Sequence, residues 1–285
     1  MAEAEPAPPV QAMPVGAAIT GARRTLEAAG CDAPRLDAEL LLGAVLGVDR
    51  SRLIIDRDRP LSTAQAVGYA ELVERRTARE PVAYILGRRE FRRLTLSVDR
   101  RVLIPRPETE LLVEAGRSLP AGWRVLDVGT GSGAVALALK DERPDLDVRG
   151  SDISEDALAV ARANAARLGL DVRFARADLL DGERCDAVLA NLPYVADGAA
   201  GSLAPEITDY EPASALFAGV DGLDVVRRLV AAVAAVPAGP AALLALEIGP
   251  EQAGEVSGLL RAAGFGAVKV RRDLSGRPRV VVGSR

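Results

Sequence analysis

From about residue 124 onward, the chain alternates short apolar runs with longer amphipathic segments. The apolar runs are four to eight residues long, as buried strands are, and the segments between them have the spacing of amphipathic helices. Strands separated by helices form a mostly parallel sheet, so we predict an α/β fold of the Rossmann-like kind. The seven predicted strands are residues 124–128, 147–151, 172–175, 185–190, 241–248, 266–271 and 279–283.

The predicted helices follow Gly133, Ser154, Gly222 and Pro250. Ser154 is a good N-cap residue, because its hydroxyl can accept a hydrogen bond from a free backbone N–H of the first helical turn. No helical pattern lies between the last two strands. We therefore predict that these two strands form a hairpin, which makes one strand of the sheet antiparallel.

The first third of the chain has a helical pattern. Ser62 and Gln65 have the spacing of a capping box, and leucines recur at helical intervals, so a small helical bundle is expected. The first residues are rich in Ala, Pro and Glu, a composition typical of disorder. The predicted domains are a disordered tail at 1–14, a helical bundle at 15–80, a β-hairpin linker at 81–107 and the α/β domain at 108–285.

The linker prediction depends on apolar residues at every second position, as at Val82, Tyr84 and Leu86. The segment also contains six arginines, which favour either a solvated hairpin or a contact with an acidic or RNA-bearing partner. They are Arg88, Arg89, Arg92, Arg93, Arg100 and Arg101.

Composition narrows the possible chemistry. The chain has 285 residues, a net charge of −4 and no histidine. The absence of histidine removes Ser/His triads and most zinc or iron sites, so we predict no metal site. The negative charge argues against a protein that coats nucleic acid, and no stable nucleic-acid partner is expected.

The location is predicted from the start of the chain and from its most apolar stretch. The first residues lack the basic and apolar regions of a signal peptide. The stretch from Leu229 to Ile248 is apolar, but a Pro-Ala-Gly-Pro sequence at 237–240 breaks it. A helix end, a turn and a strand explain it better than a membrane span. We expect a cytoplasmic monomer without a membrane segment.

The first predicted strand leads into a glycine-rich turn that suits an adenosine cofactor. Its residues are Gly129, Thr130, Gly131, Ser132 and Gly133, preceded in the strand by Asp127. Glycines let the backbone turn sharply and let a ligand approach without a Cβ clash. The same spacing also satisfies a relaxed dinucleotide-binding fingerprint, so the turn alone does not choose between cofactors.

Three further residues complete the predicted cofactor site. Asp152 ends the second strand, where it can bind ribose hydroxyls. Asp178 follows the third strand, where an adenine amino group needs an acceptor, and Leu179 beside it can pack on the adenine face. Together with the sequence after the fourth strand, which a dehydrogenase does not need, these residues predict S-adenosylmethionine as the cofactor.

The fourth strand ends in Asn191, Leu192, Pro193 and Tyr194. The Asn191 side-chain oxygen and the Leu192 carbonyl can accept two hydrogen bonds from a planar amine or amide nitrogen and so aim its lone pair at a methyl group. Pro193 restricts Leu192 to extended conformations, and Tyr194 can stack on a planar target. We predict Asn191 and Tyr194 as catalytic residues that act by positioning, with neither metal nor histidine.

These motifs, with several others, resemble the PrmC (HemK) family of protein-glutamine N5-methyltransferases, from about residue 20 to the C-terminus. The Ile104–Glu110 segment is far more specific to this family than the glycine turn. The blocks that carry the resemblance are Glu80–Gly87, Glu90–Phe91, Ile104–Glu110, Gly129–Gly133, Asn191–Tyr194, Asp209–Pro212, Asp221–Leu223, Glu247–Gly249 and Asp273–Arg277. The family usually has Asn-Pro-Pro-Tyr in its transfer motif, and this chain has leucine at position 192.

The resemblance implies a helical N-terminal domain, a hairpin linker and a seven-stranded class I methyltransferase domain. It implies that Gly129 to Gly133, Asp152, Leu179 and Asn191 contact S-adenosylmethionine, and that Asn191 to Tyr194 hold the target amide. The implied target is the glutamine of the Gly-Gly-Gln motif in class I peptide chain release factors.

Two alternatives remain open at this point. The Asn-Leu-Pro-Tyr sequence also resembles the motif of ribosomal RNA adenine dimethyltransferases, so N6-adenine methylation of nucleic acid is the second hypothesis. The third is a cofactor-binding interaction protein without catalysis.

Overall fold

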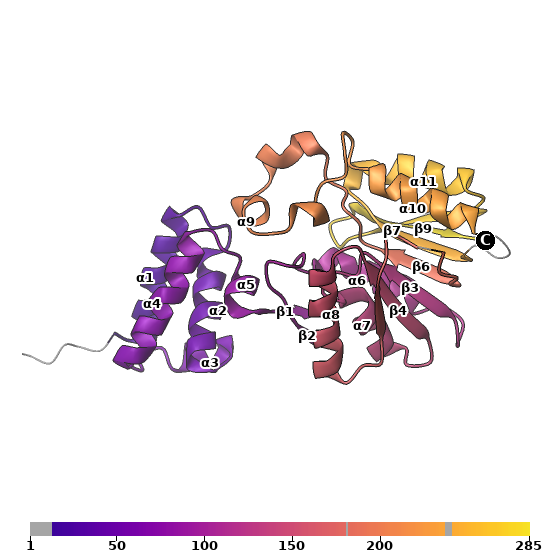
Figure 1. Ribbon diagram of the computed structural model, residues 1–285. Coiled ribbons are helices and arrows are strands. Elements are labelled where there is room, and N and C mark those ends of the chain that lie inside the picture. Colours follow the sequence, from indigo (N-terminus) through magenta and orange to yellow (C-terminus); the bar gives the residue numbers. More distant parts are fainter. Residues whose placement is uncertain (1–12, 181, 237–240) are drawn as a thin grey trace, which may run out of the picture. The chain divides into compact units, whose positions relative to one another are not determined.

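The computed structural model describes residues 13–180, 182–236 and 241–285, and its chain divides after Leu86 into two compact units (Figure 1). The first unit is helical, and the second holds the hairpin and the large sheet. Residues 1–12 of the predicted tail lie outside the described residues. Met13 is held in place, because its carbonyl accepts a hydrogen bond of 2.9 Å from the Leu61 backbone.

The described part of the first unit, residues 13–86, forms five helices. Their buried leucines share one core, and the predicted capping box is present, with Ser62 Oγ accepting from Gln65 N at 3.3 Å and Gln65 Oε1 accepting from Ser62 N at 3.0 Å. A buried ion pair of 2.8 Å between Arg76 and Asp37 joins the fourth helix to the second. The helices are α1 (Val15–Ala28), α2 (Pro34–Leu46), α3 (Arg50–Ile55), α4 (Thr63–Thr77) and α5 (Val82–Leu86).

Helix α5 corrects the extended conformation that the alternation at Val82, Tyr84 and Leu86 predicted. The backbone N–H groups of Tyr84 and Ile85 donate to the Pro81 carbonyl, so the segment forms one helical turn instead. Three apolar positions over five residues fit a short helix as well as a strand, and burial of Tyr84 and Ile85 decides between them. A hairpin is present as predicted, but its first strand lies after this helix: β1 (Arg88–Phe91) pairs antiparallel with β2 (Leu94–Ser97).

The seven predicted strands of the large sheet are all present. They are β3 (Arg124–Val128), β4 (Asp147–Asp152), β5 (Arg173–Arg176), β6 (Ala187–Ala190), β7 (Leu243–Glu247), β8 (Ala267–Arg272) and β9 (Pro278–Ser284). Their order across the sheet is β5-β4-β3-β6-β7-β9-β8. Neighbouring pairs from β5 to β7 are parallel, and β9 is antiparallel to both β7 and β8, as the hairpin prediction required.

Helices pack on both faces of this sheet (Figure 1). On one face lie α6 (Glu110–Gly116), α7 (Ala134–Glu142) and α8 (Glu155–Leu168), and on the other α10 (Asp224–Ala235) and α11 (Ala253–Ala262). Shorter turns are η1 (Pro107–Thr109), η2 (Asp197–Ser202), α9 (Pro205–Thr208), η3 (Ala213–Ala215) and η4 (Pro250–Gln252). In the described part of the chain, no helix has the length and apolar character that a membrane crossing needs.

The strand order places a ligand crevice between β3 and β6. The chain moves from β3 outward to β4 and β5, then returns to the other side of β3 as β6. At such a reversal the connecting loops diverge, and ligands of open α/β sheets bind there, at the carboxyl ends of the strands. The glycine turn after β3 and the Asn191 motif after β6 both lie at this edge.

Candidate active site

A cavity of about 450 Å³ lies at the reversal between β3 and β6. The loops after β3, β4, β5 and β6 line it, together with several residues of the segments 101–105 and 212–217. Of the predicted site residues, those that line it are Gly129, Thr130, Gly131, Ser132, Asp152, Asp178, Leu179, Asn191, Leu192 and Pro193. The structure therefore brings together residues from four separate loops.

The glycine turn has the backbone conformation that the sequence predicts. Gly129, Gly131 and Gly133 have φ angles of 70°, 55° and 82°, in the left-handed region where a side chain is strained. Gly133 is not among the described residues that line the cavity. A Cβ at this position would lie 2.9 Å from Leu137 and 3.3 Å from Phe174, so Gly133 allows the helix to pack closely on the sheet.

Two acids hold the turn in shape. The Asp127 carboxylate accepts from the Thr130 hydroxyl at 2.6 Å and from the Ala136 backbone at 3.1 Å, and burial raises the pKa of its carboxyl to about 7. The Asp152 carboxylate accepts from Gly131 N and from Ser154 N, each at 2.9 Å. Asp152 is thus fixed at the cavity wall by the loops on either side of it.

The structure pairs Asp178 with Arg228, which the sequence analysis did not identify. Their side chains form an ion pair of 2.6 Å at the cavity, and both are about half exposed. The role of Asp178 as an acceptor for adenine stays a prediction. Leu179 next to it has a φ of 62°, and its carbonyl accepts from the Ser151 hydroxyl at 3.3 Å, which fixes the backbone at this wall.

The Asn191 side chain is held from one end. Its Nδ2 donates to the Thr109 hydroxyl at 3.2 Å, and both residues line the cavity. Thr109 ends η1, within the Ile104–Glu110 block. This block carries part of the family resemblance, but no sequence pattern indicates a role for Thr109, since it and Asn191 are 82 positions apart.

Leu192, where the sequence departs from the family pattern, has a buried side chain. It packs in the core with Val128 and Leu246, and a Cβ on Gly129 would lie 3.0 Å from its Cδ2. The transfer motif therefore rests directly on the glycine turn through this leucine.

Tyr194 is not among the described cavity-lining residues, although Asn191, Leu192 and Pro193 are. Burial raises the pKa of its phenol to about 12. Its proposed stacking on the target stays a prediction.

The backbone at Tyr194 is held by Gln252 and by Gly222, which belongs to the Asp221–Leu223 block of the resemblance. Gln252 Nε2 donates to the Tyr194 carbonyl at 3.0 Å and to the Asp221 carbonyl at 3.2 Å. Gly222, with a φ of 75°, lies so close that a Cβ would come within 2.2 Å of the Tyr194 carbonyl oxygen. The Asp221–Leu223 block thus holds the end of the transfer motif.

A third link joins Arg106 to Glu211. The Arg106 guanidinium donates to the buried Glu211 carboxyl at 2.5 Å, and the Ile104 backbone donates to the other carboxyl oxygen at 3.2 Å. This pair connects the Ile104–Glu110 block with the Asp209–Pro212 block beside the cavity. No spacing rule predicts it, because 105 residues separate the partners.

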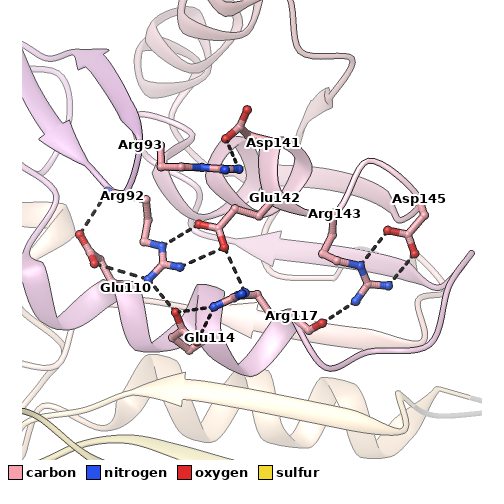
Figure 2. Close-up of polar contacts among 9 residues, drawn as sticks. All are labelled: Arg92, Arg93, Glu110, Glu114, Arg117, Asp141, Glu142, Arg143 and Asp145. Atoms are coloured by element: carbon pink, nitrogen blue, oxygen red, sulfur yellow. Dashed lines mark hydrogen bonds and ion pairs between the residues drawn. The ribbon is translucent and has the colours of Figure 1, made fainter.

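Two arginines of the hairpin, Arg92 and Arg93, pair with acids within the second unit (Figure 2). Arg92 binds both carboxylate oxygens of Glu142, at 2.8 and 3.0 Å, and Glu114 at 2.6 Å. Arg93 pairs with Asp141 at 3.0 Å. These ion pairs favour a structural role for Arg92 and Arg93 over a contact with RNA.

The cavity residues fit S-adenosylmethionine. Left-handed glycines at 129 and 131 leave the wall free of side chains there, Asp152 and Asp178 supply acceptors, and Leu179 supplies apolar surface. A mostly parallel seven-stranded sheet with its cavity at this reversal is the architecture of class I S-adenosylmethionine-dependent methyltransferases. The hMettl16 catalytic domain shares this fold, with a TM-score of 0.56 and 15% identity over 66% of this chain and 74% of that one.

Sequence comparisons identify the family. Residues 17–87 match the PrmC N-terminal domain, and residues 107–209 match the methyltransferase small domain. The release factor glutamine methyltransferase of Caulobacter vibrioides is 41% identical over 93% of this chain and 94% of its own length. That of Koribacter versatilis is 41% identical over 93% of this chain and 96% of its own length. The chain belongs to the release factor glutamine methyltransferase family.

Proposed function

We propose that this enzyme transfers a methyl group from S-adenosylmethionine to the side-chain amide nitrogen (N5) of the glutamine in the Gly-Gly-Gln motif of class I peptide chain release factors. The observation that carries the proposal is the Asn191 amide, held by Thr109 at the end of β6 and facing the cavity. Relatives named as release factor glutamine methyltransferases, similar over nearly their whole length, support the choice of target.

The glycine turn, Asp152, Asp178 and Leu179 would hold the cofactor in the cavity. When bound, S-adenosylmethionine supplies an activated methyl group on a sulfonium. The work left to the protein is to position the acceptor, because the lone pair of an amide nitrogen is delocalised into its carbonyl.

The acceptor would be positioned by Asn191 and Leu192. The Asn191 oxygen and the Leu192 carbonyl can accept hydrogen bonds from the two N–H groups of the glutamine amide, which turns its lone pair toward the cofactor. Positioning and electrostatic stabilisation of this kind account for much of enzymatic rate enhancement. Tyr194 would pack beside the amide plane.

The helical unit, which extends to Leu86, and the hairpin would dock the release factor. Because release factors act on ribosomes, we propose that the enzyme works in the cytoplasm. We also propose that the enzyme is a monomer.

Labelled S-adenosylmethionine and a purified class I release factor test the proposal. We expect label on the factor and none on a variant whose Gly-Gly-Gln glutamine is replaced by alanine. An Asn191→Ala enzyme should lose about 100-fold or more in kcat, which is typical for loss of a positioned polar group, and should still bind cofactor in part. Label on isolated ribosomal RNA and none on the release factor would contradict the proposal.

A further inference from the structure

Among the residues that the structure describes, Glu247 has the one buried side-chain oxygen without a hydrogen-bond partner, Oε2. Glu247 ends β7, next to β6, and is 2% exposed. An unpaired carboxylate oxygen in such a place is costly and calls for an explanation.

Glu247 is the far end of a chain of contacts that begins at the cavity. Asn191 Nδ2 donates to the Thr109 hydroxyl at 3.2 Å, and the Thr109 hydroxyl interacts with the Glu247 carboxyl through a side-chain hydrogen bond. Thr109 is 3% exposed. Water therefore has little access to the middle of this chain.

A hydroxyl carries one proton. When Glu247 is ionised, the hydrogen bonds that link Asn191, Thr109 and Glu247 can therefore run in one direction only. A carboxylate can only accept, so Thr109 must give its proton to Glu247 and can only accept from Asn191. Asn191 must then turn its NH₂ group toward Thr109 and leave its oxygen for the cavity. This orientation is the one that a target amide N–H needs.

We propose that Thr109 and Glu247 are positioning residues that set which end of the Asn191 amide faces the cavity. The inference rests on the proposed function, in which the Asn191 oxygen accepts a hydrogen bond from the target. It gives roles to two residues, from η1 and β7, that lie outside the loops after β3 to β6.

Protonation of Glu247 would release this constraint. A protonated Glu247 can donate to Thr109, whose own proton can then go to the Asn191 oxygen. The amide would turn over and present its NH₂ group to the cavity, where it would meet the N–H groups of the target. Asn191 therefore presents its oxygen to the target amide only when Glu247 is ionised.

The surroundings of Glu247 place this change near neutral pH. Burial raises the pKa of its carboxyl to about 7, and the negative charge of Glu108 raises it further. The hydrogen bond from Thr109 and the positive charges of Arg279 and Arg106 lower it. The Tyr194 phenol also interacts electrostatically with this carboxyl, and its own pKa is raised to about 12. Asp127, whose pKa is also raised to about 7, and Glu211, whose pKa is raised by burial, are further buried acids near the cavity that could lower the rate at acidic pH.

The first test compares Thr109→Val with Thr109→Ser. Valine keeps the shape and removes the hydroxyl, so kcat should fall about 10- to 100-fold while KM for the release factor stays within about threefold. Serine keeps the hydroxyl and should restore most of the rate. Calorimetric binding of S-adenosylhomocysteine, within about fivefold of the original protein, would show that the valine variant is folded. A folded Thr109→Val enzyme with unchanged kcat would overturn the proposal.

The second test is the pH profile of Glu247→Gln. In the original enzyme, kcat should rise between about pH 6 and 8 as Glu247 ionises. The glutamine variant should be slower at pH 8 and should lose this rise. An unchanged profile would place the titration on another group, such as Asp127 or Glu211, and would remove Glu247 from the proposal.

A third measurement needs neither a substrate nor a destabilised variant. The side-chain amide signals of Asn191 can be followed by nuclear magnetic resonance in the labelled enzyme and assigned with Asn191→Asp. They should move with a midpoint near pH 7 in the original protein and stay fixed in Glu247→Gln. An original protein that shows this shift but methylates no release factor would overturn the proposed function alone, and signals independent of pH would overturn the inference.

Discussion

Among single residues, Leu192 shows how a departure from a family pattern can be neutral for chemistry and important for stability. The proposed reaction uses only its backbone carbonyl, which any residue supplies. Its side chain is buried against Val128 and the glycine turn. The leucine therefore acts through packing, and its contact with Gly129 joins the cofactor loop to the transfer motif.

The substitution Leu192→Ala separates these two roles. It should lower the free energy of unfolding by about 2–4 kcal/mol, because it removes a buried side chain and leaves a cavity. At a temperature where the variant is folded, kcat should stay within about a factor of ten, since the carbonyl remains. Urea unfolding and the methyl-transfer assay measure the two effects.

Leu274→Ala is the matched control, because Leu274 is fully exposed at the turn between β8 and β9. It should change the stability by no more than about 0.5 kcal/mol. Equal losses in the two variants would show that Leu192 does not contribute through burial.

Among secondary-structure elements, the loop before α10 is tied to the transfer motif through Gly222. A Cβ at this glycine would lie 2.2 Å from the Tyr194 carbonyl oxygen, and Gln252 bonds the same oxygen. The chain segment from Asn191 to Tyr194 therefore depends on a loop that contributes no group to the reaction.

Gly222→Ala should displace this segment and lower kcat by about 10-fold or more, because a small misplacement of reacting groups is costly. Gly264→Ala is the control, since Gly264 has a similar φ of 87° but open space at its Cβ position. Both variants should lose about 1–2 kcal/mol of stability from the left-handed backbone. A Gly222→Ala enzyme as active as the control would show that the loop does not position the motif.

A second element, the hairpin β1–β2, is joined to α6 and α7 by Arg92 (Figure 2). Arg92 is 18% exposed, and its partner Glu142 is mostly buried, whereas Arg93 is 65% exposed. The hydrogen bond from Arg92 holds the pKa of Glu142 below its usual value, which shows that the pair favours the ionised form.

Arg92→Ala should lower the free energy of unfolding of this unit by about 2–3 kcal/mol, because it leaves a buried carboxylate without its main partner. Arg93→Ala should cost no more than about 0.5–1 kcal/mol, as exposed pairs do. Thermal unfolding of the two variants compares them directly, and an Arg93→Ala loss as large as that of Arg92→Ala would contradict the structural role given to Arg92.

These elements also show what one sequence can predict. The central strands β3, β6 and β7 were found because a strand buried on both faces needs a nearly continuous apolar run, and the glycine turn because its backbone admits few other residues. Helix α5 was missed because one helical turn and a short strand have similar patterns. Thr109, Arg228 and Glu247 were not assigned roles because their partners are distant in sequence, and only the fold brings them together.

For the molecule as a whole, two buried acids set part of the pH dependence of stability. Burial raises the pKa of both Asp127 and Glu247 to about 7, above the values of an unfolded chain. Between about pH 4 and 7 the native state then binds more protons than the unfolded state, so this contribution to stability decreases as pH rises.

Glu247→Gln should therefore stabilise the enzyme at pH 8 by about 2–3 kcal/mol and have little effect near pH 5, where the native carboxyl is already neutral. Asp127 is present in both proteins and cancels from the comparison. Urea unfolding at the two pH values measures the difference. A variant that is less stable than the original protein at pH 8 would show that the buried, ionised Glu247 carboxylate does not destabilise the native state.

The most direct test of the proposed reaction is to locate the methyl group on the product by mass spectrometry. A class I release factor incubated with the enzyme and S-adenosylmethionine would be digested, and the peptide that contains its Gly-Gly-Gln motif would be fragmented. We predict one added methyl group on the glutamine side-chain amide, and none after incubation with the Asn191→Ala enzyme. A methyl group at another residue, or an unmodified peptide from an enzyme that binds its cofactor, would contradict the assignment of Asn191 and Leu192 as the pair that holds the target amide.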